Sequence, residues 1–428
     1  MSGNCPSEGH SSLTTPTELE RHRMFRRDPQ APAETVREAV PAVVPEVVSA
    51  AAHLTDEQVE ALGAELDAIR EEVEASRGER DARYIHAVIR AQRGLEFGGR
   101  GLLLFSKFPP AWIAGTAALS VAKILENMEL GHNILHGQWD WMRDPKIHST
   151  TWDWDHVDPA EFWKRSHNYE HHTFTNIRGK DRDLGYTVMR IMPEEEWRPA
   201  HLLQPLTNVG LSLIFEYGIA LYDIETDKIR SGEKTWAEAK PQIAATLRKI
   251  GKQAAKDYVL FPLLSGPSAL STLVANFTAN TVRNVWSHAV IFCGHFPDGT
   301  ETFEEERLEG ETQGQWYIRQ MLGSANLTGS KAMHLMTGNL SHQIEHHLFP
   351  DLPSNRYAEI APKVRDICER YGLPYNAGPL PKQYAKVWRK IIRLAFPGGH
   401  ERYGAPKPTP RSRIGRAVRR AAPARVAA

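Results

Sequence analysis

Histidines gather in three short clusters along this sequence. The first cluster spaces two histidines by four residues, and in the other two a histidine is followed four and five residues later by two more. Because residues four apart lie on one face of an α-helix, each cluster can direct imidazoles towards a common point. Imidazole binds zinc, copper, iron and nickel, so the clusters predict a metal centre. Their members are His132 and His136, then His167, His171 and His172, and then His342, His346 and His347.

The number of histidines indicates how many ions this centre would hold. A zinc site uses three or four ligands, and the clusters supply eight imidazoles, so we expect two ions. A carboxylate-bridged di-iron bundle would repeat Glu-x-x-His on two helices. Near the clusters only Glu129 has that spacing, to His132. Neutral imidazoles leave the metal charge uncompensated, which suits the activation of O₂. We therefore predict two iron ions bound mostly by histidine.

Three apolar stretches surround the clusters and could form membrane-spanning helices. They are residues 101–125, 206–222 and 258–293, and each carries polar residues. As a helix the second stretch would extend about 26 Å, close to the ~30 Å of a bilayer core. Two apolar regions separate the second cluster from the third, and none separates the first two, so all the clusters can meet at one membrane face. The alternative is a soluble helical core.

Composition narrows the function classes. Lys and Arg together number 52, as do Asp and Glu, so the charge balance gives no indication of nucleic-acid binding. The three cysteines, Cys5, Cys293 and Cys368, lie far apart. We therefore expect neither disulfides nor a thiolate metal site, and a functional face in the cytosol. The first 35 residues are polar and show no secretory signal.

Four regions are expected along the chain. Residues 1–50 are rich in Pro, Ser, Glu and Ala and predict disorder. Residues 51–100 predict an amphipathic cytosolic helical region, whose first helix starts at the capping box Thr55-Asp56-Glu57-Gln58. Residues 101–375 are expected to form a membrane domain that contains the apolar stretches and the three histidine clusters. Residues 376–428 form a basic, partly disordered tail.

The clusters and their flanks resemble the integral membrane fatty-acid desaturases, a family with three histidine boxes. The resemblance runs from about His132 to Tyr357 and lies in GHNILHGQWDW, HNYEHHTFTN and HQIEHHLFPDLPSNRY. It looks closest to the actinobacterial acyl-CoA group. It implies an all-α membrane protein of about four spans, with a cytosolic helical cap that holds the dimetal site. It also implies O₂-dependent desaturation of a long-chain fatty acyl-CoA, with stearoyl-CoA and its delta-9 position as the specific expectation.

The resemblance also implies how electrons arrive. The sequence has no G-x-G-x-x-G after a strand pattern, and Pro397-Gly398-Gly399-His400 has the wrong order for a cytochrome b5 motif. We therefore expect NADPH to act through a separate flavin-dependent oxidoreductase, with or without a ferredoxin-like carrier. The expected location is the cell membrane, among membrane lipid, with the active site on its cytoplasmic face. The alternatives are a lipid or alkane hydroxylase on the same centre and a membrane metal-binding or transport protein.

The ligand set implied by the resemblance contains two choices. In the third box His342 is favoured over Gln343, because a site without thiols prefers imidazole to amide. Relatives often have a further ligand near the last span, for which His295 is favoured over His288. No catalytic group is expected beyond the metal ligands. Glu170 and Glu345 directly precede the histidine pairs and are expected to accept the second N–H of a metal-bound imidazole.

Overall fold

The computed structural model describes residues 49–397, all within one compact unit, Val48–Ala428. Of the disorder expected for residues 1–50, the part over residues 1–48 lies outside the described residues, as does Cys5, whereas Ser49 and Ala50 are described and donate hydrogen bonds to Glu301. The tail expected over residues 376–428 is described as far as residue 397. The described part is almost entirely helical, as the all-α prediction requires. Its two short strands, β1 (Asn326–Thr328) and β2 (Ala377–Pro379), pair in parallel, with Leu327 opposite Gly378.

The first described helix, α2 (Asp56–Ser76), begins at the expected capping box. The Thr55 side chain accepts a hydrogen bond from the Gln58 backbone N–H, and the Gln58 side chain accepts one from Thr55. The inner side of α2 packs against α14 (Gln313–Gly323) and α17 (Tyr357–Arg370). Its apolar side chains on that side are all buried: Val59, Leu62, Leu66, Ile69 and Val73.

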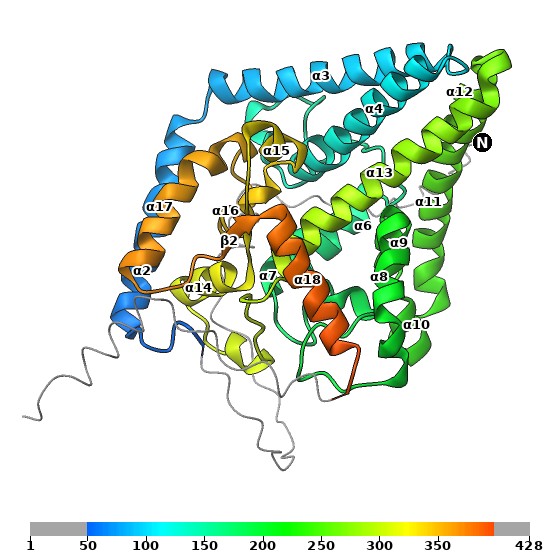
Figure 1. The fold of residues 1–428 in the computed structure, drawn as a ribbon. Coiled ribbons are helices and arrows are strands. Elements are labelled where there is room, and N and C mark those ends of the chain that lie inside the picture. The colour runs from blue at the N-terminus through cyan, green and yellow to red at the C-terminus, as the bar shows by residue number, and fades with distance from the viewer. Residues whose placement is uncertain (1–48, 398–428) are drawn as a thin grey trace, which may run out of the picture. The chain divides into compact units, whose positions relative to one another are not determined.

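A tight helical hairpin follows, formed by α3 (Glu79–Leu103) and α4 (Pro109–Leu125). In Figure 1, α3 runs along the top and α4 descends from the upper right towards the centre. The two helices approach closely at Gly99 and Gly115, where a Cβ on either residue would lie 3.0–3.1 Å from the carbonyl oxygen of the other. Two glycines therefore set the spacing of the helix that leads into the first histidine cluster.

The longest helix, α13 (Ala269–His295), packs against α4 and also ends at the centre of the fold. The segment before it contains α11 (Trp236–Ala254), the π-helix η6 (Ala255–Leu260) and α12 (Phe261–Leu264). Beside α13 lie α8 (Gln204–Leu213), α9 (Phe215–Asp223) and α18 (Leu380–Leu394). The remaining helices are α5 (Asn133–Leu135), α6 (Ala160–Trp163), α7 (His172–Phe174), α10 (Thr226–Ser231), α15 (Lys331–Met336) and α16 (Gln343–Leu348).

Among the described helices, we find none that is both long enough and apolar enough for a membrane span. The spans expected from the three apolar stretches therefore remain a prediction. Lys123, Glu216 and Arg283 interrupt these stretches and are buried. Arg283 pairs with Glu216, and Lys123 donates to Asp257 at 2.7 Å.

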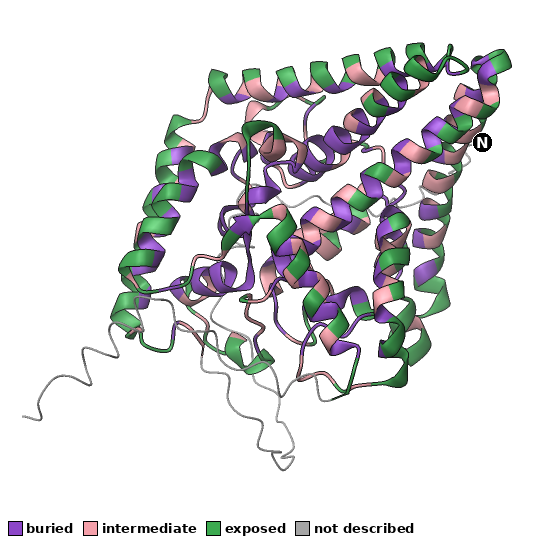
Figure 2. Ribbon diagram, in the orientation of Figure 1, coloured by how far each residue is buried: buried purple, intermediate pink, exposed green. Residues whose placement is uncertain are grey.

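Figure 2 shows the buried residues gathered where α4, α13, α14 and α16 converge, with the outward sides of α2, α3 and α11 exposed. One apolar cluster joins α2, α14, α16 and α17. A second lies around Phe292 of α13 and includes Val387 and Ile391 of α18. The histidine clusters lie where these elements meet.

Candidate metal centre

The first histidine cluster is carried by a continuous helical path. Helix α4 passes into the π-helix η1 (Glu126–His132) and then into α5. A π-turn contains one more residue than an α-turn, and such turns are frequent at functional sites. The rings of His132 and His136 lie with their centroids 4.6 Å apart. The path is tightly packed, because a Cβ at Gly131 would lie 2.8 Å from Cε3 of Trp154.

The second cluster also lies on a π-helix. Helix α6 continues as η3 (Lys164–His171), and α7 begins at His172. Trp163, at the end of α6, stacks on His167 with 4.5 Å between ring centroids. It also meets His132 edge-on at 5.3 Å. An apolar ring therefore covers imidazoles of two clusters.

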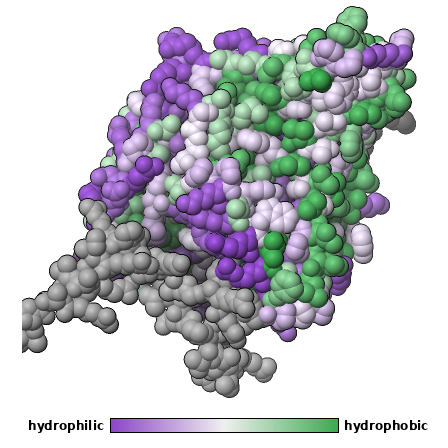
Figure 3. Space-filling model, in the orientation of Figure 1, coloured by the Kyte–Doolittle hydropathy of each residue, from purple (hydrophilic) through white to green (hydrophobic). Residues whose placement is uncertain are grey.

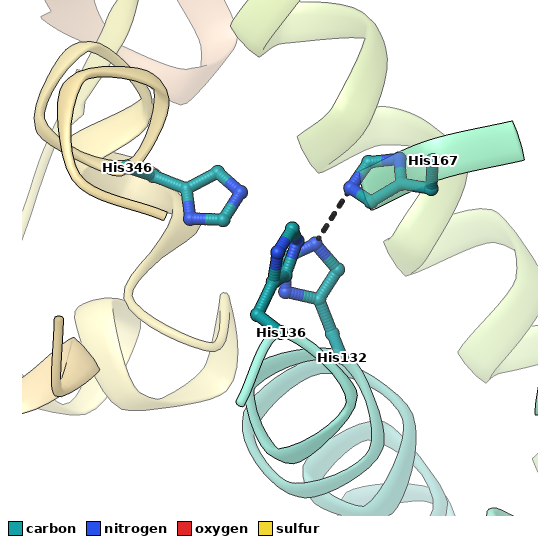
Figure 4. Close-up of side chains that lie close together, drawn as sticks. All are labelled: His132, His136, His167 and His346. Atoms are coloured by element: carbon teal, nitrogen blue, oxygen red, sulfur yellow. Dashed lines mark hydrogen bonds between the residues drawn. The ribbon is translucent and has the colours of Figure 1, made fainter. Parts of the chain in front are cut away.

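Two groups of imidazoles form from the three clusters and α13. The first imidazole group contains His132, His136, His167 and His346, and the second contains His171, His295 and His347. Within each group one ligand nitrogen of every ring lies within 4.8 Å of the others. Figure 4 shows the first group, with His132 and His136 rising from one helix and His167 and His346 approaching from other elements. A third set that could hold an ion, His167, His171 and Asp183, shares one histidine with each group. These sets could hold metal, and the two iron ions expected from the sequence remain a prediction.

His172 lies between the groups. Its ring centroid is 4.7 Å from that of His136 and 4.8 Å from that of His346, in the first group. It is 4.5 Å from that of His347, in the second. Both ring nitrogens of His172 are buried without a hydrogen-bond partner. All three members of the second cluster thus face the centre.

The third box departs from the favoured assignment. Helix α16 begins at Gln343, so His342 is not on the same helix as His346 and His347, and the four-residue spacing does not align it with them. The His342 ring stacks on His334 instead, with 4.7 Å between centroids, and belongs to neither group. The Gln343 side chain reaches the second group, where its Nε2 lies 3.2 Å from Nε2 of His295.

The structure also separates the two candidates on α13. His295 belongs to the second group. His288 lies outside both groups, with its Nε2 3.1 Å from Oδ1 of Asn208 and its ring stacked on Phe292 at 3.8 Å. The two residues are seven apart, or about two helical turns, so both face the same side of α13 at different depths.

The expected carboxylate partners do not contact the imidazole groups. Glu170 lies 3.5 Å from Arg165. Glu345 accepts hydrogen bonds from the Asn326 side chain and the Tyr375 hydroxyl, each at 2.8 Å. A residue directly before a ligand points about 100° away from it on a helix, which explains both placements.

Two aspartates that the sequence interpretation missed take this role. Both oxygens of Asp181 lie 3.1 Å from Nδ1 of His171, and an oxygen of Asp183 lies 3.6 Å from it. Asp183 is also 3.8 Å from Nδ1 of His167. Burial favours the neutral His171 ring, but the two carboxylates outweigh it and raise the pKa of His171 to about 9. The sequence signal for them was two aspartates separated by one residue, Asp181 and Asp183, in the loop after the second box.

Neutral partners support the third box. Nδ1 of His347 lies 3.0 Å from Oε1 of Gln320, and Nδ1 of His346 lies 3.3 Å from the Tyr357 hydroxyl. These contacts leave the Nε2 atom of each ring directed into its group. Gln320 carries no sequence signal, because it comes from α14, 27 residues before His347. Tyr357 ends the sequence motif of the third box, eleven residues after His346.

The buried nitrogens of the site fit metal ions. Burial lowers the pKa of His136, His172, His346 and His347 well below its usual value, so these rings are neutral, as ligands must be. His171, which Asp181 and Asp183 hold charged, would release its proton on binding an ion. A buried polar atom without a partner costs free energy, and a bound ion would remove that cost. The partnerless atoms of the two groups include Nε2 of His136, His171, His346 and His347 and Nδ1 of His295.

Glu129, the only candidate for a carboxylate bridge, serves another purpose. It accepts hydrogen bonds from the Tyr84 hydroxyl at 2.9 Å, the Asn339 amide at 3.0 Å and the Ser354 hydroxyl at 2.6 Å. These donors come from α3 and from segments before and after the third box. Glu129 therefore connects the π-helix of the first box to the third box.

One protein family and three individual proteins are similar to this chain. Residues 108–379 match the family model described as fatty acid desaturase. The NADPH-dependent stearoyl-CoA 9-desaturase of Mycobacterium tuberculosis is 51% identical over 358 residues, covering 83% of this chain and 84% of that protein. The sn-1 linoleoyl-lipid 6-desaturase of Synechocystis is 27% identical over 277 residues, covering 63% and 76%. Human fatty acid desaturase 3 is 23% identical over 307 residues, covering 68% and 63%.

Proposed function

This chain belongs to the fatty acid desaturase family, and from that premise we propose that it desaturates a long-chain fatty acyl-CoA. The specific substrate we propose is stearoyl-CoA, with the double bond placed at the delta-9 position to give oleoyl-CoA. The family resemblance read from the three boxes is confirmed. The substrate is supported by the name of the relative that is 51% identical over most of both chains.

The observation that carries the proposal is the pair of imidazole groups. Desaturation takes one hydrogen from each of two adjacent carbons and reduces O₂ to two waters, so it consumes two electrons and two protons. The first group offers four imidazoles, two of them buried and two half-buried, and the second offers three buried ones beside an amide. Iron bound in the two groups would supply the O₂ activation. The histidines would hold the metal, with His172 between the groups as a further ligand.

The protein's own part is to hold these ligands in place and exclude water. Asp181 fixes the His171 ring through Nδ1, and Gln320 does the same for His347. Trp163 covers the first group with its indole. A centre that excludes water protects a reactive oxidant from side reactions. We propose that electrons come from NADPH through a separate flavin-dependent oxidoreductase, with or without a ferredoxin-like carrier. The name of the mycobacterial relative supports NADPH as their source.

We place the protein at the cell membrane, with the metal centre on the cytoplasmic face. Large apolar side chains that are unusually exposed support this location. Phe105, between α3 and α4, is 68% exposed, and Leu270, at the start of α13, is 76% exposed. Figure 3 shows hydrophobic side chains spread over the side of the molecule that carries α8, α12 and α13, and hydrophilic ones over α2 and α17. Exposed apolar patches of this kind mark contact with a membrane or a partner.

Expression in a host that lacks its own desaturase tests the proposal. Gas chromatography–mass spectrometry of the fatty acids should show an oleoyl product, and its derivatives should locate the double bond at carbon 9. The purified protein should contain iron. Hydroxylated acids in place of alkenes would favour the hydroxylase alternative, and zinc without any lipid product would favour a metal-binding protein. Either result would overturn the proposal.

A further inference from the structure

The outward side of α18 is a basic surface that the proposed reaction does not use. This helix contains no acidic residue. Lys382 is exposed, and Lys386 is half-buried within the electrostatic reach of Asp298. Asp298 pairs with Arg389 at one edge of the surface. The helix also carries Arg393, which is half-buried, and Lys390, which is buried.

The inward side holds α18 in one orientation. Val387, Ile391 and Leu394 are buried against the core. The last turn is also fixed through its carbonyl groups, because the Gln204 amide donates to the Ile391 carbonyl at 2.6 Å and the Trp197 indole donates to the Ala395 carbonyl at 2.8 Å. These contacts prevent α18 from rotating about its own axis, so Lys382 stays exposed.

An apolar margin continues from the end of α18 onto its neighbours. Ile392 and Phe396 are 48% and 56% exposed, and Leu203 and Leu206, at the start of α8, are 60% and 70% exposed. The hydrogen bond from Gln204 brings the start of α8 to the last turn of α18. In Figure 3 the hydrophilic patch in the middle of the face adjoins hydrophobic side chains on its right. The cationic side chains of α18 thus border directly on exposed apolar side chains.

We propose that α18 docks on the anionic phospholipid headgroups of the bilayer, with Ile392 and Phe396 directed into its apolar edge. The inference rests on the membrane location proposed above. Lysines near an anionic bilayer surface are attracted to it, and their long stems let the ammonium groups reach phosphate. Helices with one cationic side and one apolar side lie along such interfaces. An acidic protein would match the charge but would leave the apolar margin exposed, so lipid fits better.

Lipid retention by the full chain tests this inference. The protein is purified in a neutral detergent, mixed with phosphatidylcholine and phosphatidylglycerol in equal amounts, and the retained lipids are quantified by mass spectrometry. We expect the wild type to retain more phosphatidylglycerol than phosphatidylcholine. In the double variant Lys382→Gln/Lys386→Gln the ratio of the two retained lipids should fall about tenfold. Lys382→Arg/Lys386→Arg should keep it. The matched control Lys331→Gln/Lys363→Gln removes the same charge elsewhere and should also keep it.

Four outcomes overturn the inference. The first is equal retention of the two lipids by the wild type, and the second is an unchanged preference in the Lys→Gln variant. The third is displacement of phosphatidylglycerol by inorganic phosphate or free coenzyme A, which would indicate a soluble anion site. The fourth is binding of an acidic ferredoxin that depends on Lys382 and Lys386 in the absence of any lipid preference.

Acyl-CoA desaturation in detergent is assayed on the same samples. Its absence alongside a retained lipid preference would count against the proposed function alone.

Discussion

The two imidazole groups share the second and third boxes but differ in their remaining ligands, from the first box or from α13, and in the charge beside them. The first group has four rings; two are supported by neutral atoms, the Asn133 amide beside His132 and the Tyr357 hydroxyl beside His346, and His167 lies 3.8 Å from the Asp183 carboxylate. The second has three rings, the amide of Gln343 and the carboxylate of Asp181 against His171. The basicity of the ligands and the charge beside them set the redox potential of a bound metal. Two ions bound in these groups would therefore not be equivalent, and the second group, with Asp181 and Asp183 against His171, would better stabilise the more positive one.

The largest effect should come from removing one ligand of each group. We expect His346→Ala and His171→Ala to abolish product formation, because both ions are needed, and each to lower the iron content by about half, because the other group stays intact. Product is measured by gas chromatography–mass spectrometry and iron by elemental analysis. His148→Ala, outside both groups, is the control. Product retained in both variants would refute the assignment.

A smaller effect should come from removing the carboxylate charge beside the second group. Asp181→Asn keeps the size of the side chain but removes the charge beside His171, so we expect a 10–100-fold loss of metal affinity, confined to the second group. Titration with a chelator, followed by iron analysis, measures it. The paired variant Glu170→Gln should behave as the wild type. Equal loss from both groups would show that the charge difference does not matter.

The third box offers a direct comparison of neighbouring residues. We expect Gln343→Ala to lower activity about tenfold, because it removes the amide beside His295, and His342→Ala to change activity by less than about twofold. Initial rates at equal iron content give the comparison. The reverse order would return His342 to the ligand set.

The smallest effect should appear in the metal-free protein as a function of pH. The pKa of His171 is raised from 6.5 to about 9, so its stabilising contribution is fully present below pH 6.5 and is lost as the pH rises through 9. The pKa of His136 and His346 is lowered by burial, so stability falls as the pH drops below 6.5. The alkaline trend amounts to about 3 kcal/mol. Thermal unfolding after chelation measures both, and Asp181→Asn should weaken the alkaline trend alone.

The repeated spacing of the boxes allowed the centre to be predicted, but not its division into two groups. The adjacent residues His346 and His347 point about 100° apart on α16 and enter different groups. His167 and His171 are also divided, although they share one helical face. Spacing along a helix shows which residues can meet, whereas the partners from other segments decide where each one goes.

The misses have a common physical cause. Asp181 lies in a loop, where no periodicity marks it, and Gln320 comes from a distant helix. His342 fits the four-residue pattern, but the helix starts only after it. The fold was easier to predict where a cap and an apolar face agreed, as in α2, than where charged residues interrupt apolar stretches, as with Lys123 in α4.

The π-helices η1 and η3 have a consequence for how the centre tolerates change in chain length. Each wide turn holds one residue more than an ordinary turn, so deleting a single residue from Glu126–His132 would close it to an ordinary helical turn. The helix on either side would keep its direction, but positions inside the turn would each be rotated by about 100°. Because every residue of this segment except Asn127 is buried, a gene that lost one codon there would encode a protein with a misaligned first box.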